Sequence, residues 1–314
     1  MFLDLGSVDN GDLDRGRLSR TLEQWDWHAH SDRDQCAQRI EGRQVVVSNK
    51  CALDRTVLAG ARALRLVVIA ATGANNVDLD AAREQGLTVC NSRDYATRSV
   101  TQHVITLMLN LLSAQARYAE RVRDGEWSRA RQFCLIDLPI REAAGLNFGV
   151  IGHGVLGQSV AQAAQALGMN VLLAERKGRK PRPDHLAFED VVAHADVLSL
   201  HCPLTEETRG LINRAVMQRM KRTAILINTA RGGIVDERDL ASCLRDGIIA
   251  GAGVDVLSQE PPPPDHPLLA GDIPNLIVTP HNAWASRSAR QALLDQVAST
   301  IRAFERGQPV NRLC

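Results

Sequence analysis

A glycine-rich turn carries the most specific chemistry in the sequence. Gly152, Gly154 and Gly157 are spaced as GxGxxG between a predicted strand, Phe148–Ile151, and a predicted helix, Gln158–Leu167. The first glycine permits a tight turn, the second lets a pyrophosphate approach the backbone, and the third lets the helix pack closely on the strand. The helix N-terminus offers free amide donors to the phosphates. A dinucleotide site is therefore predicted at Gly152-His153-Gly154-Val155-Leu156-Gly157.

An acidic residue follows at the end of the next predicted strand. Glu175 lies 23 residues after Gly152, directly after the strand Val171–Ala174. A carboxylate there accepts hydrogen bonds from the adenosine ribose and repels a 2′-phosphate, which favours NAD over NADP. Arg176 and Lys177 follow at once and are able to bind that phosphate, so NADP remains possible.

The elements that position these residues alternate between short apolar runs and helical patterns. This alternation predicts an α/β fold with doubly wound parallel sheets. Four strands are expected in the first part of the chain, at Phe2–Leu5, Val45–Val47, Leu66–Ala70 and Leu87–Val89. A long helix is expected over Thr97–Arg123, where apolar residues recur at helical spacing. Six strands are expected after it, at Phe148–Ile151, Val171–Ala174, Val197–Leu200, Ala224–Ile227, Gly251–Val254 and Leu276–Val278, before a last helix over Arg287–Arg306.

Composition narrows the class of protein. A chain of 314 residues suits two domains, and a net charge of +1 gives no field that points to nucleic acid or a membrane. Seven cysteines with no CxxC pair argue against a disulfide framework, and no histidine or acid has zinc-ligand spacing, so no metal is expected. No basic and apolar leader is visible, so the expected location is the cytoplasm.

Further motif-like stretches occur along nearly the whole chain. They are Thr72–Asp80, Gly149–Gly157, Asp196–Thr208, Ile227–Gly233, Gly253–Val256 with Glu260-Pro261, and Thr279-Pro280-His281. Together these stretches resemble the D-isomer-specific 2-hydroxyacid dehydrogenases. The segment Phe133–Glu142 and the run Ala283-Trp284-Ala285-Ser286 are most similar to the glycerate dehydrogenase, or hydroxypyruvate reductase, branch of that family.

The resemblance implies an inserted architecture. An NAD(P)-binding Rossmann domain over residues 96–285 would interrupt a substrate domain made of residues 1–95 and 286–314. It also implies a homodimer, in which the irregular segment Gly125–Gly145 reaches across to the second copy. The reaction expected is reduction of a small 2-keto acid, hydroxypyruvate or glyoxylate, to D-glycerate or glycolate.

Three residues fit the needs of that reaction. Arg231, after a strand end, has the planar fork that binds a carboxylate and polarises the adjacent carbonyl. His281, after the last strand, suits the acid that protonates the developing alkoxide. Glu260 suits its partner, because a carboxylate beside an imidazole raises the imidazole pKa and fixes the ring orientation.

The remaining assignments follow from the family pattern. Asp255 is expected to hold the nicotinamide carboxamide, and the cofactor cleft to be lined by His201, Cys202, Pro203, Thr208, Thr229 and Ala230. The substrate is expected near Thr72, Gly73 and Ala74, whose amides would bind its carboxylate, and near Lys50 and Trp284. Two alternatives stay open. One is a dehydrogenase for another 2-keto acid, of the phosphoglycerate or lactate type. The other is a non-catalytic, dinucleotide-sensing protein of the corepressor kind.

Overall fold

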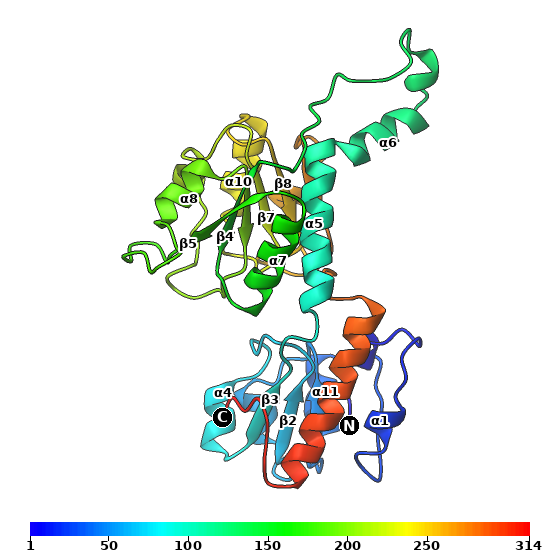
Figure 1. The fold of residues 1–314 in the computed structure, drawn as a ribbon. Helices are drawn as coiled ribbons and strands as arrows, with labels where there is room; N and C mark the ends of the chain where they lie inside the picture. Colours follow the sequence, from blue (N-terminus) through cyan, green and yellow to red (C-terminus); the bar gives the residue numbers. More distant parts are fainter. The chain divides into compact units, whose positions relative to one another are not determined.

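The computed structural model describes residues 1–314. The chain divides into two compact units, which we call the discontinuous unit, Met1–Ala96 with Trp284–Cys314, and the central unit, Thr97–Ala283. Each unit is an α/β structure built on a parallel sheet (Figure 1), which confirms the predicted fold class. None of the helices combines the length and the apolar character that a bilayer span requires.

The central unit holds six parallel strands in the order β5-β4-β6-β7-β8-β9. An isolated parallel bridge, Ala174↔Leu186, marks the position of one more extended segment beside β5. Because the strands are parallel, the loops at their carboxyl ends meet at one edge of the sheet, where ligands bind in such folds. The strands are β4 (Asn147–Ile151), β5 (Asn170–Ala174), β6 (Val197–Leu200), β7 (Ile225–Asn228), β8 (Gly251–Val254) and β9 (Leu276–Val278).

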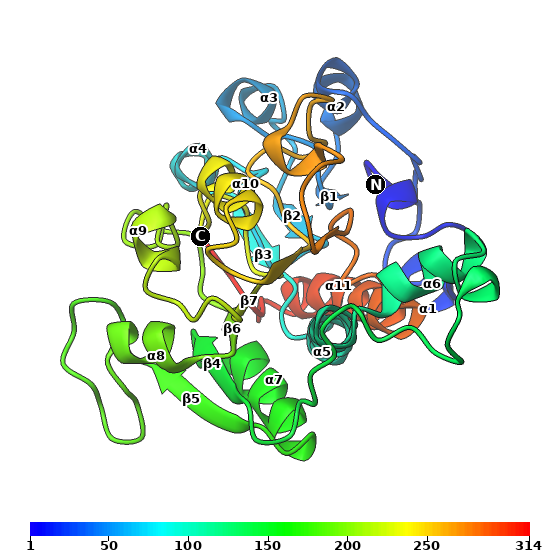
Figure 2. The ribbon, with the colours of Figure 1, turned by 90° about the horizontal axis from the view of Figure 1, so that it is seen from above.

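Helices cover both faces of this sheet. On one face α7 packs on β4 and β5, and α5 packs on β7 and β8 (Figure 2). Gly253 of β8 makes that approach possible, because a Cβ there would lie 3.1 Å from Cβ of Leu107 on α5. The opposite face carries the larger apolar cluster, with residues from α8, α9 and α10. The bounds are α5 (Thr97–Ser113), α6 (Gln115–Arg123), η2 (Trp127–Arg129), α7 (Val155–Ala166), α8 (Phe188–His194), α9 (Arg214–Met217), α10 (Glu237–Arg245) and η3 (Pro267–Leu269).

The single long helix predicted over Thr97–Arg123 is wrong, because the structure has two helices. Ala114 takes a left-handed φ of 50° between α5 and α6. The Asn110 side chain accepts a hydrogen bond from the Ala116 amide at 3.0 Å, which satisfies one of the free donors at the start of α6. Apolar burial also stops at this point, since α5 buries residues up to Leu112 and α6 buries none.

The discontinuous unit has a three-stranded parallel sheet, β1-β2-β3. One face is covered by α2, α3 and α4, and the other by α1 and α11, which lie side by side. Asp32, Asp54 and Asp78 each cap a helix on the first face by accepting a backbone N–H three residues on. The bounds are η1 (Leu5–Ser7), α1 (Gly16–Ser19), α2 (Arg33–Ile40), β1 (Val45–Ser48), α3 (Arg55–Ala59), β2 (Leu66–Ile69), α4 (Leu79–Glu84), β3 (Thr88–Asn91) and α11 (Arg287–Glu305).

The strand predicted over Phe2–Leu5 is shorter than expected. Phe2 forms isolated parallel bridges with Val47 and Trp27, and η1 begins at Leu5. The buried carboxylate of Asp4 ends the extended segment, since it accepts hydrogen bonds from the amides of Asn49, Lys50 and Cys51.

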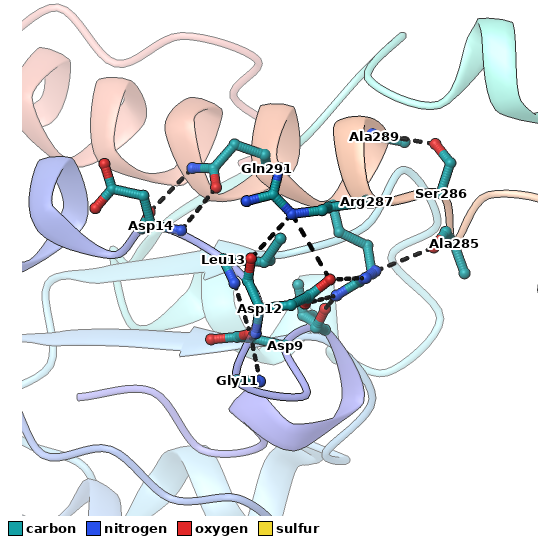
Figure 3. A network of polar contacts seen from close by, with 12 residues as sticks. Asp9, Gly11, Asp12, Leu13, Asp14, Ala285, Ser286, Arg287, Ala289 and Gln291 are labelled. Atoms are coloured by element: carbon teal, nitrogen blue, oxygen red, sulfur yellow. Dashed lines mark hydrogen bonds and ion pairs between the residues drawn. The ribbon is translucent and has the colours of Figure 1, made fainter.

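A polar network ties the N-terminal segment to the start of α11 (Figure 3). The Arg290 guanidinium donates to both carboxylate oxygens of Asp12, at 2.7 and 2.8 Å, and its Nε donates to the Ala285 carbonyl at 3.0 Å. Gln291 exchanges two hydrogen bonds with the backbone of Asp14. Both chain ends are therefore held in one folded unit.

Candidate active site

The glycine loop follows β4, and each glycine has a separate structural reason. Gly152 has a φ of 95°, and a Cβ there would lie 2.6 Å from the Cys202 amide nitrogen. A Cβ on Gly157 would lie 2.1 Å from the Gly152 carbonyl oxygen. Gly154 is the N-cap of α7, and a Cβ there would meet no protein atom within 4 Å. The loop therefore leaves open space above the free amides of α7, which fits a pyrophosphate.

Glu175 follows β5 and is buried, with its carboxylate held by the loop after it. Oε1 accepts from the Arg176 amide at 2.9 Å, and Oε2 accepts from Arg182 Nε at 2.6 Å and the Arg182 amide at 3.3 Å. The Arg176 amide, followed by the Arg182 side chain, lowers the pKa of Glu175 to about 2. The carboxylate is anionic at any working pH, and Oε1 retains capacity for one more donor.

The basic residues after Glu175 differ in their surroundings. Arg176 and Lys177 are exposed, and the Lys177 ammonium lies 5.6 Å from the Phe188 ring centroid. His185 in the same loop meets the glycine-loop residue His153 edge to face, with the ring centroids 5.7 Å apart. Burial, followed by the neighbouring His185 and Arg182, lowers the pKa of His153 and so favours its neutral ring.

Two buried polar atoms after β6 and β7 have no hydrogen-bond partner in the protein. They are Nδ1 of His201 and Oγ1 of Thr229. Nε2 of His201 contacts the Ser199 hydroxyl at 2.9 Å, and burial lowers the pKa of His201 to about 4. Buried polar groups are almost always paired, so these two atoms fit a polar ligand along the sheet edge.

Other residues predicted for this edge have structural contacts. Thr208 donates its hydroxyl to the Pro203 carbonyl at 2.7 Å and closes the loop after β6. Burial raises the pKa of the Cys202 thiol, so it stays protonated. Ala230 is buried after β7.

Asp255, after β8, is buried and accepts three hydrogen bonds from the segment after β9. Oδ1 accepts from the Thr279 hydroxyl at 2.5 Å and the Asn282 amide at 3.1 Å, and Oδ2 accepts from the Ala283 amide at 3.0 Å. Nε2 of His103 lies 3.0 Å from the same Thr279 hydroxyl. Asp255 therefore fixes the backbone on both sides of His281, a role that the sequence did not reveal.

The structure brings His281 and Glu260 together. Nδ1 of His281 lies 2.6 Å from Oε2 of Glu260, and the other carboxylate oxygen accepts from the Leu257 amide at 2.9 Å. His281 has a left-handed φ of 50°, and its amide donates to the Asp255 carbonyl at 2.9 Å. Because Nδ1 faces the carboxylate, proton exchange between the ring and a ligand would use Nε2.

Arg231 lies in the loop after β7, and β8 separates that strand from β9 in the sheet. Asn228 shapes the loop, because its side chain accepts from the Ala230 amide and donates to the Arg231 carbonyl. One Arg231 nitrogen, Nη1, donates to the Ala230 carbonyl at 2.6 Å. The guanidinium and the imidazole thus come from strands on either side of β8, at the same edge.

The predicted substrate residues belong to the discontinuous unit. Thr72, Gly73 and Ala74 follow β2 at its carboxyl end, and the Thr72 carbonyl accepts from Asn91 at 2.7 Å. Lys50 lines a pocket with Asp4, Ser7, His30 and Cys51. Trp284 packs edge to face on Tyr95, with centroids 6.2 Å apart, in the apolar cluster under α11.

Comparisons with known proteins agree with this geometry. The family model of the D-isomer-specific 2-hydroxyacid dehydrogenase NAD-binding domain matches residues 105–283. The chain is 42% identical to the glycerate dehydrogenase of Methylorubrum extorquens, over 95% of this chain and 96% of the relative. It is 35% identical to the hydroxypyruvate reductase of Blautia hydrogenotrophica, over 99% of this chain and 98% of the relative.

A solved structure shows the same fold. D-lactate dehydrogenase from Aquifex aeolicus, complexed with NAD and lactic acid, superposes with a TM-score of 0.82 at 26% identity, covering 98% of this chain and 95% of that one. The resemblance drawn from the sequence motifs is confirmed. The chain belongs to the D-isomer-specific 2-hydroxyacid dehydrogenase family, whose members are NAD-dependent oxidoreductases acting on 2-hydroxy acids.

Proposed function

We propose that the chain reduces hydroxypyruvate, and also glyoxylate, with NADH, to give D-glycerate and glycolate. The observation that carries the reaction is the 2.6 Å contact between His281 and Glu260, at the same sheet edge as Arg231. The substrate follows from the two relatives named glycerate dehydrogenase and hydroxypyruvate reductase, which match almost end to end.

In this proposal each catalytic residue has one task. Arg231 binds the substrate carboxylate and places positive charge on the carbonyl oxygen. His281 holds a proton on Nε2 and transfers it to that oxygen as the carbonyl carbon is reduced. Glu260 orients the ring and stabilises its cationic form. NADH, when bound, supplies the hydride.

The cofactor residues divide between phosphate and adenosine. The loop Gly152–Gly157 would hold the pyrophosphate, with Thr229 and His201 giving polar contacts along the edge. Glu175 would accept one ribose hydroxyl on its remaining lone pair, which favours NADH. The exposed Arg176 and Lys177 would bind the 2′-phosphate if NADPH were used.

The discontinuous unit has the role of a substrate domain in this proposal, and the central unit that of the NAD domain. Thr72, Gly73 and Ala74 would give amides to the substrate carboxylate. Lys50 would shape the pocket. The packing of Trp284 on Tyr95 favours a structural role for this tryptophan.

We infer a homodimer from the surface of the central unit. Figure 1 shows α6 and the segment after it projecting away from the sheet of this unit. Phe133 and Ile136 in that segment are 89% and 74% exposed, and Ile140 is 60% exposed. Apolar surface of this kind marks an interface, and a second copy of the chain is the partner that fits the family.

Phe133→Ser with Ile136→Ser should convert a dimer into a monomer in analytical ultracentrifugation, whereas a wild-type monomer would contradict the inference.

A reducing compartment, the cytoplasm, suits the free thiols of the chain. Four cysteines are buried and three are partly exposed, and none forms a disulfide.

The test is the loss of reduced-nicotinamide absorbance with NADH and NADPH in parallel, against hydroxypyruvate, glyoxylate and pyruvate. Turnover fastest with NADH and hydroxypyruvate would support the proposal. Faster turnover of pyruvate would assign the lactate type. NADH binding without turnover of any of the three would favour a sensor.

A further inference from the structure

Glu260 lies in a segment without regular secondary structure, between β8 and η3, so its position depends on specific contacts. The segment is pressed on Gly232, where a Cβ would lie 2.0 Å from the Leu257 carbonyl carbon and 2.3 Å from the Ser258 nitrogen. Gly232 directly follows Arg231 in the sequence. The turn that carries Glu260 is therefore packed against the loop that carries the arginine.

One partly buried carboxylate holds that turn through hydrogen bonds. Glu237 is the first residue of α10, and its side chain is 11% exposed. Its Oε1 accepts from the Ser258 amide at 2.6 Å, and its Oε2 accepts from the Ser258 hydroxyl at 2.6 Å. The N-terminus of α10 favours a negative charge at this position.

A histidine completes the arrangement. Nε2 of His266 lies 2.9 Å from Oε2 of Glu237, and His266 is 6% exposed. Nδ1 of His266 accepts from the Leu268 amide at 3.3 Å, so the neutral ring carries its hydrogen on Nε2 and donates it to Glu237. The carboxylate thus receives three hydrogen bonds, two of them from the turn itself.

We propose that Glu237 is a positioning residue, which holds Ser258 so that the Glu260 carboxylate reaches His281. The proposal rests on the function proposed above, in which His281 protonates the substrate. Glu237 contacts Ser258, so its effect on His281 runs through the turn Leu257–Glu260. Two independent contacts of this turn, on Gly232 and on Glu237, hold the backbone from which Glu260 reaches the Leu257 amide and the imidazole.

The test compares Glu237→Gln, Glu260→Gln and the double variant. The readout is the pH profile of kcat/KM for hydroxypyruvate with NADH. Glutamine keeps the size of Glu237 but loses its charge and one acceptor for Ser258 and His266. We expect kcat to fall roughly tenfold or more, because a small displacement away from the reacting atoms can cost up to about a hundredfold. The high-pH limb should move to lower pH, and NADH affinity, measured by fluorescence, should stay unchanged.

The double variant separates positioning from general stability. If Glu237 acts through Glu260, adding Glu237→Gln to Glu260→Gln should shift the pH limb no further. Two other titratable neighbours remain in every variant: Asp255, whose backbone carbonyl accepts from the His281 amide, and His103, which lies beside the Asp255 carboxylate. Glu189→Gln, in the first turn of α8, is the matched control and should leave the profile unchanged.

The outcomes distinguish a failure of the positioning role of Glu237 from a failure of the proposed function. A Glu237→Gln protein with the wild-type rate and pH profile, or an equal further shift in the double variant, overturns the inference. If Glu237→Gln does not fold, Ser258→Ala, which removes the hydroxyl donor to Glu237, is the second variant. It should move the high-pH limb in the same direction by a smaller amount, and an unmoved limb would also overturn the inference. An inactive wild-type protein would refute the proposed function instead.

Discussion

Replacing Glu260 with glutamine removes the carboxylate that contacts His281 at 2.6 Å. Two unit charges about 4 Å apart interact by about 1 kcal/mol in bulk water, and by about 4 kcal/mol at the effective dielectric of a protein surface. The two side chains are 28% and 34% exposed, so the pair lies between these limits. We take about 2 kcal/mol for the interaction that the variant loses.

The direction of the expected change in the pH profile follows from the proposed role of the His281 imidazole. In the proposed mechanism, reduction needs the protonated ring and the Glu260 carboxylate stabilises that proton, so activity of the variant should be lost at lower pH. The high-pH limb of kcat/KM for hydroxypyruvate should therefore move to lower pH, since this ratio reports the groups of the free enzyme. Glu207→Gln, an exposed glutamate, is the control. An unmoved limb in Glu260→Gln, with the variant folded and binding NADH, would refute the coupling of the two groups.

Three further predictions concern other residues at the same sheet edge. Arg231→Ala should lower kcat/KM by roughly a hundredfold or more with NADH affinity retained, and an equal loss of NADH binding in titration would contradict its role toward substrate. Glu175→Gln should narrow the ratio of kcat/KM for NADH over NADPH, and an unchanged ratio would assign the choice to the basic loop. His201 has a pKa lowered by burial to about 4. Its proton is therefore taken up more readily by the unfolded chain, and stability should fall by about 3 kcal/mol as the pH drops from about 6.5 to 4. Urea unfolding of His201→Gln should show less of this loss, and a wild-type acid sensitivity in that variant would be inconsistent with a buried neutral ring.

The glycine loop was predictable because two of its three glycines meet a local steric demand. Gly152 and Gly157 are required by the turn and the helix contact, and both demands lie within six residues of sequence. The six strands of the central unit were equally visible, because buried parallel strands are continuous apolar runs. The pairing of His281 with Glu260 followed from family motifs, since the sequence separation of 21 residues carries no geometric signal by itself.

Contacts between loops were not predictable. Nothing in the spacing of Glu175 and Arg182 indicates that the arginine would pair with the carboxylate expected to receive the ribose. The break at Ala114 was missed for a related reason, because alanine is a strong helix former and its left-handed φ is set by the surrounding fold. The contact of Glu237 with Ser258 joins positions 21 residues apart, and only the position of Glu237 at a helix start was visible in the sequence.

The left-handed backbone at His281 restricts which amino acids the position tolerates. Asparagine and aspartate enter this region of φ and ψ with little strain, whereas β-branched residues do so rarely. A library with every amino acid at position 281 should therefore contain two kinds of inactive variant, those that fold and those that do not. Among the folded ones, His281→Asn keeps a polar side chain without a titrating ring, which makes it the suitable inactive protein for capturing cofactor and keto acid together in a crystal.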